Sequence, residues 1–244
     1  MYYYDTTFSS PEENLAFDEA ILEKWAQEKI KEPFVRIWEP QKPFVVIGRS
    51  SKSAEEVNLK YCQDNNIGVF RRTSGGTAIV TGPGCLMYGV VLSYEEYPHL
   101  KQVDKAHCLV LSRLIQATCK SLPPEIAQQI SLQGTCDLTL GDKKISGNSL
   151  RCKRTHLLYH GTLLYHFDLD LVTKSLLSPP RQPEYRSNRG HGEFLANFPL
   201  DPKTFRQNFL TSWNATTLLP EVPYDKMANL TEEKYSRPSW NFRI

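Results

Sequence analysis

The chain has 244 residues, 40% of them hydrophobic and 23% charged, which is typical of a globular protein with a substantial core. Its 29 basic and 27 acidic residues leave a formal charge of +2, which argues against a broad polyanion-binding surface and tight nucleic-acid binding. The start, M-Y-Y-Y-D-T-T, lacks the basic and apolar regions of a signal peptide. No apolar run approaches the roughly 20 residues that span a bilayer. We therefore expect one cytoplasmic domain over residues 1–244, without a membrane partner.

The first predicted elements are a short edge strand, Tyr2–Tyr4, and a helix that starts near Ser10. Ser10, Pro11 and Glu13 supply a cap, a first-turn proline and a capping-box glutamate. One face of this helix is apolar and should pack on a sheet, with Leu15, Leu22 and Trp25 on it.

Two strand-like runs follow, Phe34–Trp38 and Phe44–Gly48, joined by a turn that contains Pro40. Ser53 with Glu56 then predicts a second capped helix, with Val57, Leu59 and Cys62 along it.

The next stretch, F-R-R-T-S-G-G-T-A-I-V-T-G-P-G-C-L-M-Y from Phe70 to Tyr88, is typical of a binding loop. Adjacent glycines let the backbone approach a ligand closely. Free backbone N–H groups, together with Arg71 and Arg72, suit a phosphate or a carboxylate. A hairpin turn with two solvated arginines is the alternative, and the combination of features favours the binding loop.

Leu86–Leu92 is then strand-like, and Val103–Lys120 has helical spacing, with His107 expected to pack rather than to bind a metal. Gly141-Asp142 predicts a two-residue hairpin. Side chains alternate along a strand, so only one of Lys143 and Lys144 points inward, and the pattern favours Lys144.

Further along, Gly147 permits close backbone approach, and the strand Leu157–Tyr165 is interrupted by Gly161, which indicates a bulge or a ligand against it. Helices are predicted at Leu169–Leu177 and Asp201–Trp213, and the tail after them as mostly irregular. Between the helices, the arginine-rich segment 179–194 is long enough to be a functional loop or a flexible surface excursion.

The six cysteines are scattered without any C-x-x-C pair, so reduced thiols are expected and a zinc site is not. In the absence of other information each is interpreted as a small buried hydrophobe.

Several spaced motifs in one order resemble the lipoate–protein ligase family, whose catalytic domain is shared with octanoyltransferases and, more distantly, with biotin–protein ligases. They are N-L-A-F-D-E-A (14–20), F-V-R-I-W…F-V-V-I-G-R (34–49), R-R-T-S-G-G-T-A-I-V (71–80), D-L…K-K-I-S-G-N-S (137–149), Y-H-G-T-L-L (159–164) and S-R-P-S-W-N-F (236–242). The second motif is similar to the family's paired strands before the binding loop. The resemblance implies an α/β (α+β) fold like that of class II synthetases and biotin ligases. Its mixed, largely antiparallel sheet would be flanked by helices.

The resemblance also implies an activity: lipoate or octanoate is activated with ATP and magnesium, and the acyl group passes to a lysine of a lipoyl domain or H-protein-like acceptor. Lys144 takes the position of the family's essential lysine, and Asp137 that of a magnesium ligand. The acyl-adenylate would contact Arg72, Ser74, Gly75, Gly76, Thr77, Ala78, Ile79, Val80, Gly147, His160 and Gly161. The chain ends where the family's large domain ends, so a separate small accessory protein is an expected partner.

Departures from the family pattern keep two alternatives open. Thr77 replaces the loop's third glycine, Thr81-Gly82 replaces a His-Asp pair, and Cys136 replaces an asparagine. An octanoyl or lipoyl transferase would work without ATP through a cysteine thioester, for which Cys136 and Cys85 are the candidates. The other alternative is a non-catalytic relative that only binds a lipoyl group, which Lys144 argues against. Biotin ligation is disfavoured because Gly48-Arg49 is not followed by that family's arginine- and glycine-rich loop.

Overall fold

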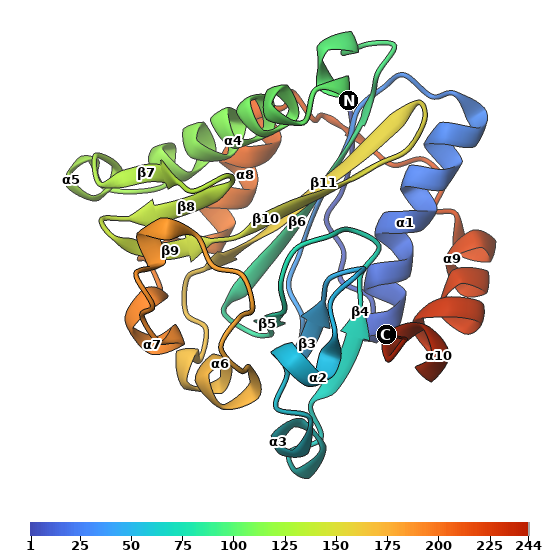
Figure 1. The fold of residues 1–244 in the computed structure, drawn as a ribbon. Helices are drawn as coiled ribbons and strands as arrows, with labels where there is room; N and C mark the ends of the chain where they lie inside the picture. Colours follow the sequence, from blue (N-terminus) through green and yellow to red (C-terminus); the bar gives the residue numbers. More distant parts are fainter. Residues whose placement is uncertain (244) are drawn as a thin grey trace.

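The computed structural model describes residues 1–243 and contains three β-sheets with helices around them (Figure 1). The central sheet has the order β10-β11-β6-β2-β1-β12, and two three-stranded sheets have the orders β4-β3-β5 and β7-β8-β9. The strands are β1 (Tyr2–Tyr4), β2 (Phe34–Trp38), β3 (Phe44–Ile47), β4 (Gly68–Arg71), β5 (Ile79–Thr81), β6 (Cys85–Ser93), β7 (Ile130–Gln133), β8 (Asp137–Leu140), β9 (Lys143–Ser146), β10 (Asn148–Cys152), β11 (His156–Leu164) and β12 (Thr217–Leu218). The α-helices are α1 (Pro11–Glu28), α2 (Ser53–Glu56), α3 (Leu59–Asp64), α4 (Val103–Lys120), α5 (Pro124–Ala127), α6 (Leu169–Ser175), α7 (His191–Phe194), α8 (Pro202–Ser212), α9 (Tyr224–Leu230) and α10 (Pro238–Asn241). Pro98–Lys101 and Glu184–Arg186 are 3₁₀ turns, and Thr231–Tyr235 is a π-helical turn.

Most strand pairs are antiparallel, and the parallel ones are β1 with β2, β1 with β12, and β3 with β4. The predicted α/β class with a mixed, largely antiparallel sheet is therefore confirmed. Strand β1 lies inside the central sheet, between β2 and β12, and not at its edge as predicted.

Helix α1 begins as its sequence predicts. The Ser10 hydroxyl accepts from the Glu13 backbone N–H, and the Glu13 carboxylate accepts from the Ser10 N–H, which completes a capping box. The apolar face that includes Leu15, Leu22 and Trp25 is buried. Burial of this face against the central sheet supplies most of the helix's stability.

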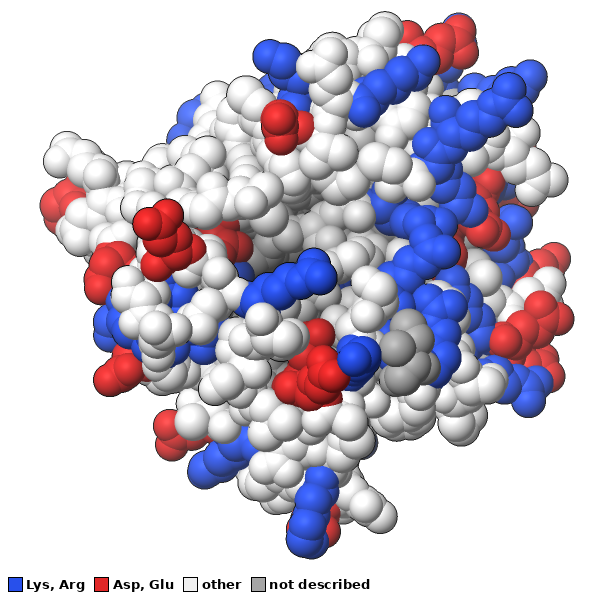
Figure 2. Space-filling view, viewed as in Figure 1, with Lys and Arg blue, Asp and Glu red and all other residues white. Residues whose placement is uncertain are grey.

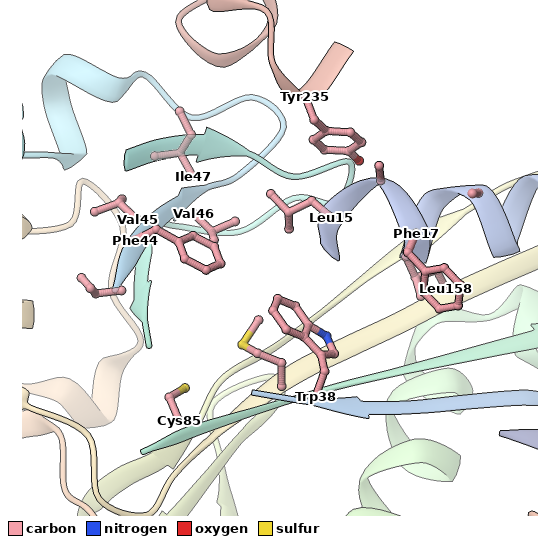
Figure 3. Packing of buried hydrophobic residues seen from close by; sticks show 14 of the residues in the cluster. Leu15, Phe17, Trp38, Phe44, Val45, Val46, Ile47, Cys85, Leu158 and Tyr235 are labelled. Atoms are coloured by element: carbon pink, nitrogen blue, oxygen red, sulfur yellow. The ribbon is translucent and has the colours of Figure 1, made fainter. Parts of the chain in front are cut away.

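The central sheet separates two apolar cores. Helix α1 and the small β3–β5 sheet cover one core, and helices α4 and α8 lie over the other (Figure 1). In the first core, Leu15 of α1, Val46 of β3 and Trp38 of β2 point toward one another (Figure 3). The small sheet is thereby packed on the same face of the central sheet as α1.

Two predictions are wrong, one implied by the family resemblance and one drawn from the local pattern. Strands β2 and β3 are not paired, because β2 joins β1 and β6 while β3 joins β4 and β5. The predicted second helix is also divided: Val57 is extended and bridges Leu176, and α3 restarts with Asn58 as its cap. Since the bridge is a contact with a distant segment, the local pattern does not contain it.

The tail is helical rather than irregular, with α9, the π-helical turn and α10 packed beside α1 and β4. Within residues 1–243, no helix is both long and apolar enough to cross a membrane.

Candidate functional site

A cleft of about 700 Å³ lies between the two small sheets, against one face of the central sheet. Ten predicted site residues line it: Arg72, Gly76, Thr77, Ile79, Cys136, Asp137, Lys144, Gly147, His160 and Gly161. The other five, Ser74, Gly75, Ala78, Val80 and Cys85, are not among the lining residues. The two motifs that are distant in sequence, the glycine stretch and the lysine hairpin, therefore meet at one site.

Residues 72–78, here called the glycine loop, connect β4 with β5 along one wall of the cleft. Gly76 adopts a φ of +92°, a conformation that side chains other than glycine rarely allow. Its carbonyl accepts from the Ser51 hydroxyl at 3.1 Å, and the Gly75 carbonyl accepts from the Ser149 hydroxyl at 2.9 Å. Gly48 is required beneath the loop, because a Cβ there would lie 1.9 Å from the Gly76 oxygen.

Arg72 shapes this loop. Its guanidinium donates to the carbonyls of Val46, Gly75 and Thr77 and to the Ser74 hydroxyl. Burial lowers its pKa to about 10, which leaves it charged at neutral pH. Arg72 therefore brings a fixed positive charge to the cleft wall while it holds the loop backbone.

Arg71 has a different role from the one that we predicted. Its side chain is fully buried, and its guanidinium donates to six carbonyls, three in residues 48–51 and three in residues 240–243. In return, Trp240 Nε1 donates to the Arg71 carbonyl at 2.8 Å, and Asn241 Oδ1 accepts from the Arg71 N–H at 2.9 Å. Arg71 is therefore not available to an anion. Through these bonds the S-R-P-S-W-N-F motif holds Arg71, the residue that precedes the glycine loop, in place.

His160 on β11 faces the glycine loop. Its Nε2 lies 2.5 Å from the Ser74 hydroxyl, which also accepts from Arg72 Nε. Burial, with the neighbouring Arg72 charge, lowers the pKa of His160 to about 3. The imidazole is therefore neutral, and the Ser74 hydroxyl is left to donate to Nε2.

Lys144 points into the cleft and Lys143 points away from it, as predicted. The Lys144 ammonium lies 2.8 Å from Asp137 Oδ1 across the hairpin, and the Lys144 side chain retains an exposure of 25%. Gly147 makes room for it, since a Cβ there would be 2.9 Å from Nζ. A cation that is both held and accessible can stabilise negative charge that develops on a substrate.

Gly161 does not mark a bulge, because β11 pairs with β6 without interruption from His156 to Leu164. A Cβ at Gly161 would lie 1.9 Å from Asn148 Oδ1, and that amide accepts from the Tyr88 hydroxyl at 2.6 Å. The glycine therefore lets the Asn148 side chain cross the floor of the cleft.

Segment 179–194 is ordered around the hairpin by its own polar side chains. The Tyr185 hydroxyl donates to Asp137 Oδ2 at 2.8 Å, and Arg189 forms an ion pair with Asp142 at 2.7 Å. Its residues 180–183 line the cleft. Sequence reasoning did not single out Tyr185, and the pattern of the segment gives no signal for this contact.

Glu56 is a second residue that sequence reasoning did not place in the site. Its buried carboxylate accepts from the Ala78 N–H at 2.6 Å and lines the cleft. The sequence pattern predicts that Glu56 is part of a helix cap. The break after α2 turns it toward the end of the glycine loop instead.

The polar residues of the first-helix motif are also explained. Asp18 forms a buried ion pair with Arg36 at 2.8 Å and lines the cleft. Burial raises the pKa of Asp18, and the Arg36 charge opposes that rise. Glu19 accepts from the hydroxyls of Thr73 and Tyr235, so it ties the glycine loop to the C-terminal helices.

The two cysteine candidates are both placed unfavourably for nucleophilic attack. Cys136 lies in the cleft, but burial is the largest of the effects that raise its pKa, to about 11, and its Sγ lies 3.1 Å from the Asn148 carbonyl. Cys85 is fully buried in the apolar core, where desolvation raises its pKa to about 12. Burial therefore disfavours the thiolate form of both cysteines in this structure.

Asp137, the predicted magnesium ligand, already accepts from Lys144 and Tyr185. Among residues 1–243, no three His, Cys, Asp or Glu side chains cluster as metal ligands do. Magnesium that accompanies a nucleotide takes one or two carboxylates plus phosphate oxygens and water. The residues present would offer Asp137 as one ligand of an ion that a nucleotide brings, and residues 1–243 hold no three-residue metal cluster of their own.

Comparison with known proteins gives the family. The lipoyl protein ligase A/B catalytic domain model matches residues 10–197, so the chain belongs to that family. Lipoate–protein ligase 1 of Staphylococcus aureus is 24% identical over 251 residues, which cover 98% of this chain and 72% of that protein. The octanoyltransferase LipM of Bacillus cereus is 23% identical over 273 residues, which cover 99% and 97%. The family therefore includes similar enzymes of both reaction types.

Solved structures agree on the fold. A bipartite lipoate protein ligase from Thermoplasma acidophilum, described with its E2 lipoyl domain, has a TM-score of 0.77 at 23% identity, with 99% of this chain and 96% of that chain covered. A lipoate–protein ligase A bound with ATP also has a TM-score of 0.77 at 23% identity, with 99% and 97% covered. A T. acidophilum protein with bound lipoic acid has a TM-score of 0.77 at 22% identity, with 100% and 98% covered. At these identities, the likeness establishes the shared fold.

Proposed function

We propose that this member of the lipoyl protein ligase A/B catalytic domain family is an ATP-dependent lipoate–protein ligase. It converts lipoate, or octanoate, to the acyl-adenylate and transfers the acyl group to a lysine of a lipoyl-accepting protein. The observation that supports this most directly is the accessible Lys144 ammonium in the same cleft as the glycine loop. Relatives that are named lipoate–protein ligases support the same class.

The lining of the cleft suits an acyl chain at its inner end. Apolar side chains from α1, β2, β3 and β6 meet there, namely Leu15, Trp38, Val46 and Met87. A saturated chain or a dithiolane ring loses water on entering such a space, at a gain of roughly 25 cal/mol per Å² of apolar surface. The carboxyl end would then extend toward Lys144 and the glycine loop.

The nucleotide would bind between the glycine loop and residues 180–183, both of which line the cleft. Arg72 supplies a fixed positive charge beside it, and the loop supplies backbone groups within reach of a phosphate. A lipoate–protein ligase A with the same fold has been solved with ATP bound, which supports a nucleotide as a substrate. Magnesium would be carried with the phosphates and would neutralise part of their charge.

Lys144 has the role of an electrostatic stabiliser in both half-reactions. When the carboxylate attacks the α-phosphate, and when the acceptor lysine attacks the acyl-adenylate, negative charge grows on oxygens next to the reacting atoms. An ammonium already in position stabilises that charge without reorganisation. The Asp137 carboxylate fixes the direction of the ammonium.

A cysteine-dependent octanoyl or lipoyl transferase is the second candidate, and octanoyltransferase relatives are its support. The raised pKa values of Cys136 and Cys85 argue against it. A non-catalytic lipoyl-binding protein is the third, and it would have little use for the Lys144 ammonium.

A direct test is to incubate the protein with ATP, magnesium, lipoate and an unmodified lipoyl domain, and to weigh the domain by mass spectrometry. We expect lipoylation that requires ATP. Octanoyl-carrier protein without ATP should give no acyl transfer. If neither mixture is active, adding a separate small accessory domain tests whether that partner is needed.

A further inference from the structure

A band of basic side chains borders the mouth of the cleft (Figure 2). We call it the basic ridge, and its members are Arg49, Arg151, Lys153, Arg154, Lys234 and Arg243. Lys234 and Arg243 both lie over the Trp240 ring, Arg243 bonds to Arg49, and Lys153 lies near Lys234 in the β10–β11 hairpin that also carries Arg151 and Arg154. They come from the end of β3, the β10–β11 hairpin, the π-helical turn and the C-terminal segment. The chain's formal charge is only +2, so this concentration is local.

The ridge is joined directly to the glycine loop. The Arg49 N–H donates to the Ser74 carbonyl at 2.8 Å, and Arg243 Nη2 donates to the Arg49 carbonyl at 3.0 Å. On β10, Arg151 follows two residues after Ser149, whose hydroxyl holds the Gly75 carbonyl. The ridge therefore adjoins the glycine-loop side of the cleft.

The charges on the ridge are of two kinds. Lys153 pairs with Glu23 at 2.6 Å, and Lys234 pairs with Glu19. By contrast, no carboxylate in residues 1–243 lies within ion-pair distance of Arg49, Arg151 or Arg154. The positive charges of these three arginines are thus not neutralised by an ion pair within the described chain.

Parts of the ridge are rigid, and they have the composition of an interface. The Arg243 guanidinium stacks on the Trp240 ring at 3.8 Å, and Trp240 is fixed through its bond to the Arg71 carbonyl. Phe242, beside it, is 48% exposed. Arginine and aromatic side chains are the types enriched where proteins bind each other.

We propose that the basic ridge is the docking surface for the acyl acceptor, and that this acceptor is a protein domain with an acidic surface around its target lysine. The inference rests on the proposed function. A lysine that enters the cleft leaves the body of its domain on the rim, where the unpaired arginines attract carboxylates. Such complementary charge accelerates encounter and sets orientation.

The test uses the double variant Arg151→Glu/Arg154→Glu, because both side chains lie outside the cleft lining. Its binding to an unmodified E2 lipoyl domain is measured at low and high salt, together with the KM for that domain. We expect Kd and KM to rise about tenfold or more at low salt, and the difference to shrink as salt screens the charges. The matched control is Lys105→Glu on α4, which should leave Kd and KM unchanged. Lys105 is exposed, lies outside the ridge and has no ion pair in the described chain.

Lipoate-dependent exchange of pyrophosphate into ATP reports the first half-reaction, which needs no acceptor. We expect the double variant to retain it fully. If the wild-type protein shows no exchange yet binds the lipoyl domain with a charge-dependent Kd, the proposed function fails and the docking surface stands. Equal Kd values for the wild type and the double variant at low salt would overturn the docking surface. So would binding of the ridge to phosphatidylserine vesicles with no effect on the acceptor.

Discussion

The Lys144 ammonium lies 2.8 Å from Oδ1 of Asp137, across the hairpin that joins β8 to β9. The two residues lie on strands joined by the two-residue turn Gly141-Asp142, with a register shift between Leu138 and Thr139, so the pair forms within one hairpin. An ion pair on a rigid hairpin can hold a catalytic cation in place before substrate arrives.

Changing Lys144 to alanine should lower the rate of lipoyl transfer by about 10²–10³, which is the usual cost of removing one group that stabilises transition-state charge. The matched control is Lys143→Ala, since Lys143 is the preceding residue and points to solvent. Steady-state transfer and a thermal melt of each variant provide the readouts. Equal activity of the two variants would contradict the role of Lys144.

Tyr185 donates to Oδ2 of the same Asp137 carboxylate at 2.8 Å, and thereby fastens segment 179–194 to the hairpin. In Tyr185→Phe we expect faster hydrogen exchange over residues 180–189, and binding of lipoate with ATP should restore much of the protection. Tyr165→Phe removes a similar bond, to Glu39 at 2.8 Å, and should leave that exchange unchanged.

If residues 180–189 exchange equally fast in the wild type and in Tyr185→Phe, the Tyr185 bond does not hold the segment. If bound substrates leave the exchange unchanged, the segment does not close over them.

The lysine hairpin was predictable because its determinants are local. Gly141-Asp142 defines the turn, and strand alternation places Lys144 inward. The same alternation points the adjacent Arg71 and Arg72 side chains in opposite directions, but it does not predict which of the two faces the cleft. Arg71 bonds to residues 240–243, about 170 positions away in sequence, and no local pattern contains such a contact.

Sheet pairing shows the same limit. The family resemblance implies that β2 and β3 are paired, yet the two strands enter different sheets. The choice depends on partners such as β6 and β4, which come later in the chain. The helical tail was missed because its short helices are stabilised by packing beside α1 rather than by a long apolar period.

Arg71→Met should destabilise the protein by at least about 3 kcal/mol, because it leaves several carbonyls without a donor and each costs about 1–3 kcal/mol. Urea unfolding measures the loss, and we expect faster proteolysis after residue 230 in the same variant. Arg154→Met, at an exposed position, should stay within about 0.5 kcal/mol of the wild type. A similarly small effect of Arg71→Met would show that the C-terminal segment is held by its apolar contacts instead.

His160 should make the protein less stable in mild acid. The pKa of the His160 imidazole is about 3 in the folded protein and about 6.5 in the unfolded chain. Below pH 6.5 the unfolded state therefore binds more protons than the folded state. The stabilising contribution is complete above pH 6.5 and is lost as the pH falls toward 3, at up to about 1.4 kcal/mol per pH unit.

In His160→Gln, whose amide can still accept from the Ser74 hydroxyl, the fall in unfolding free energy between pH 7.5 and 5.5 should be about 1 kcal/mol smaller than in the wild type. His166→Gln, at an exposed position, controls for the loss of an imidazole. An unchanged pH dependence in His160→Gln would mean that the imidazole is charged in the fold.

The cysteines decide between ligase and thioester transferase. For a ligase, Cys136→Ser should keep most transfer activity, and Cys85→Ser should lose stability, by about 1–2 kcal/mol, more than activity. Cys136 should also react with iodoacetamide at pH 8 more slowly than the exposed Cys108 and Cys152, because burial, the largest cause of the shift, raises its pKa to about 11. Intact-mass measurement after incubation with octanoyl-carrier protein should then find no acyl group on the protein. An octanoyl adduct that forms without ATP and disappears in Cys136→Ser would instead assign the thioester route, because Cys136 is the only one of the two candidate thiols that lines the cleft beside Lys144.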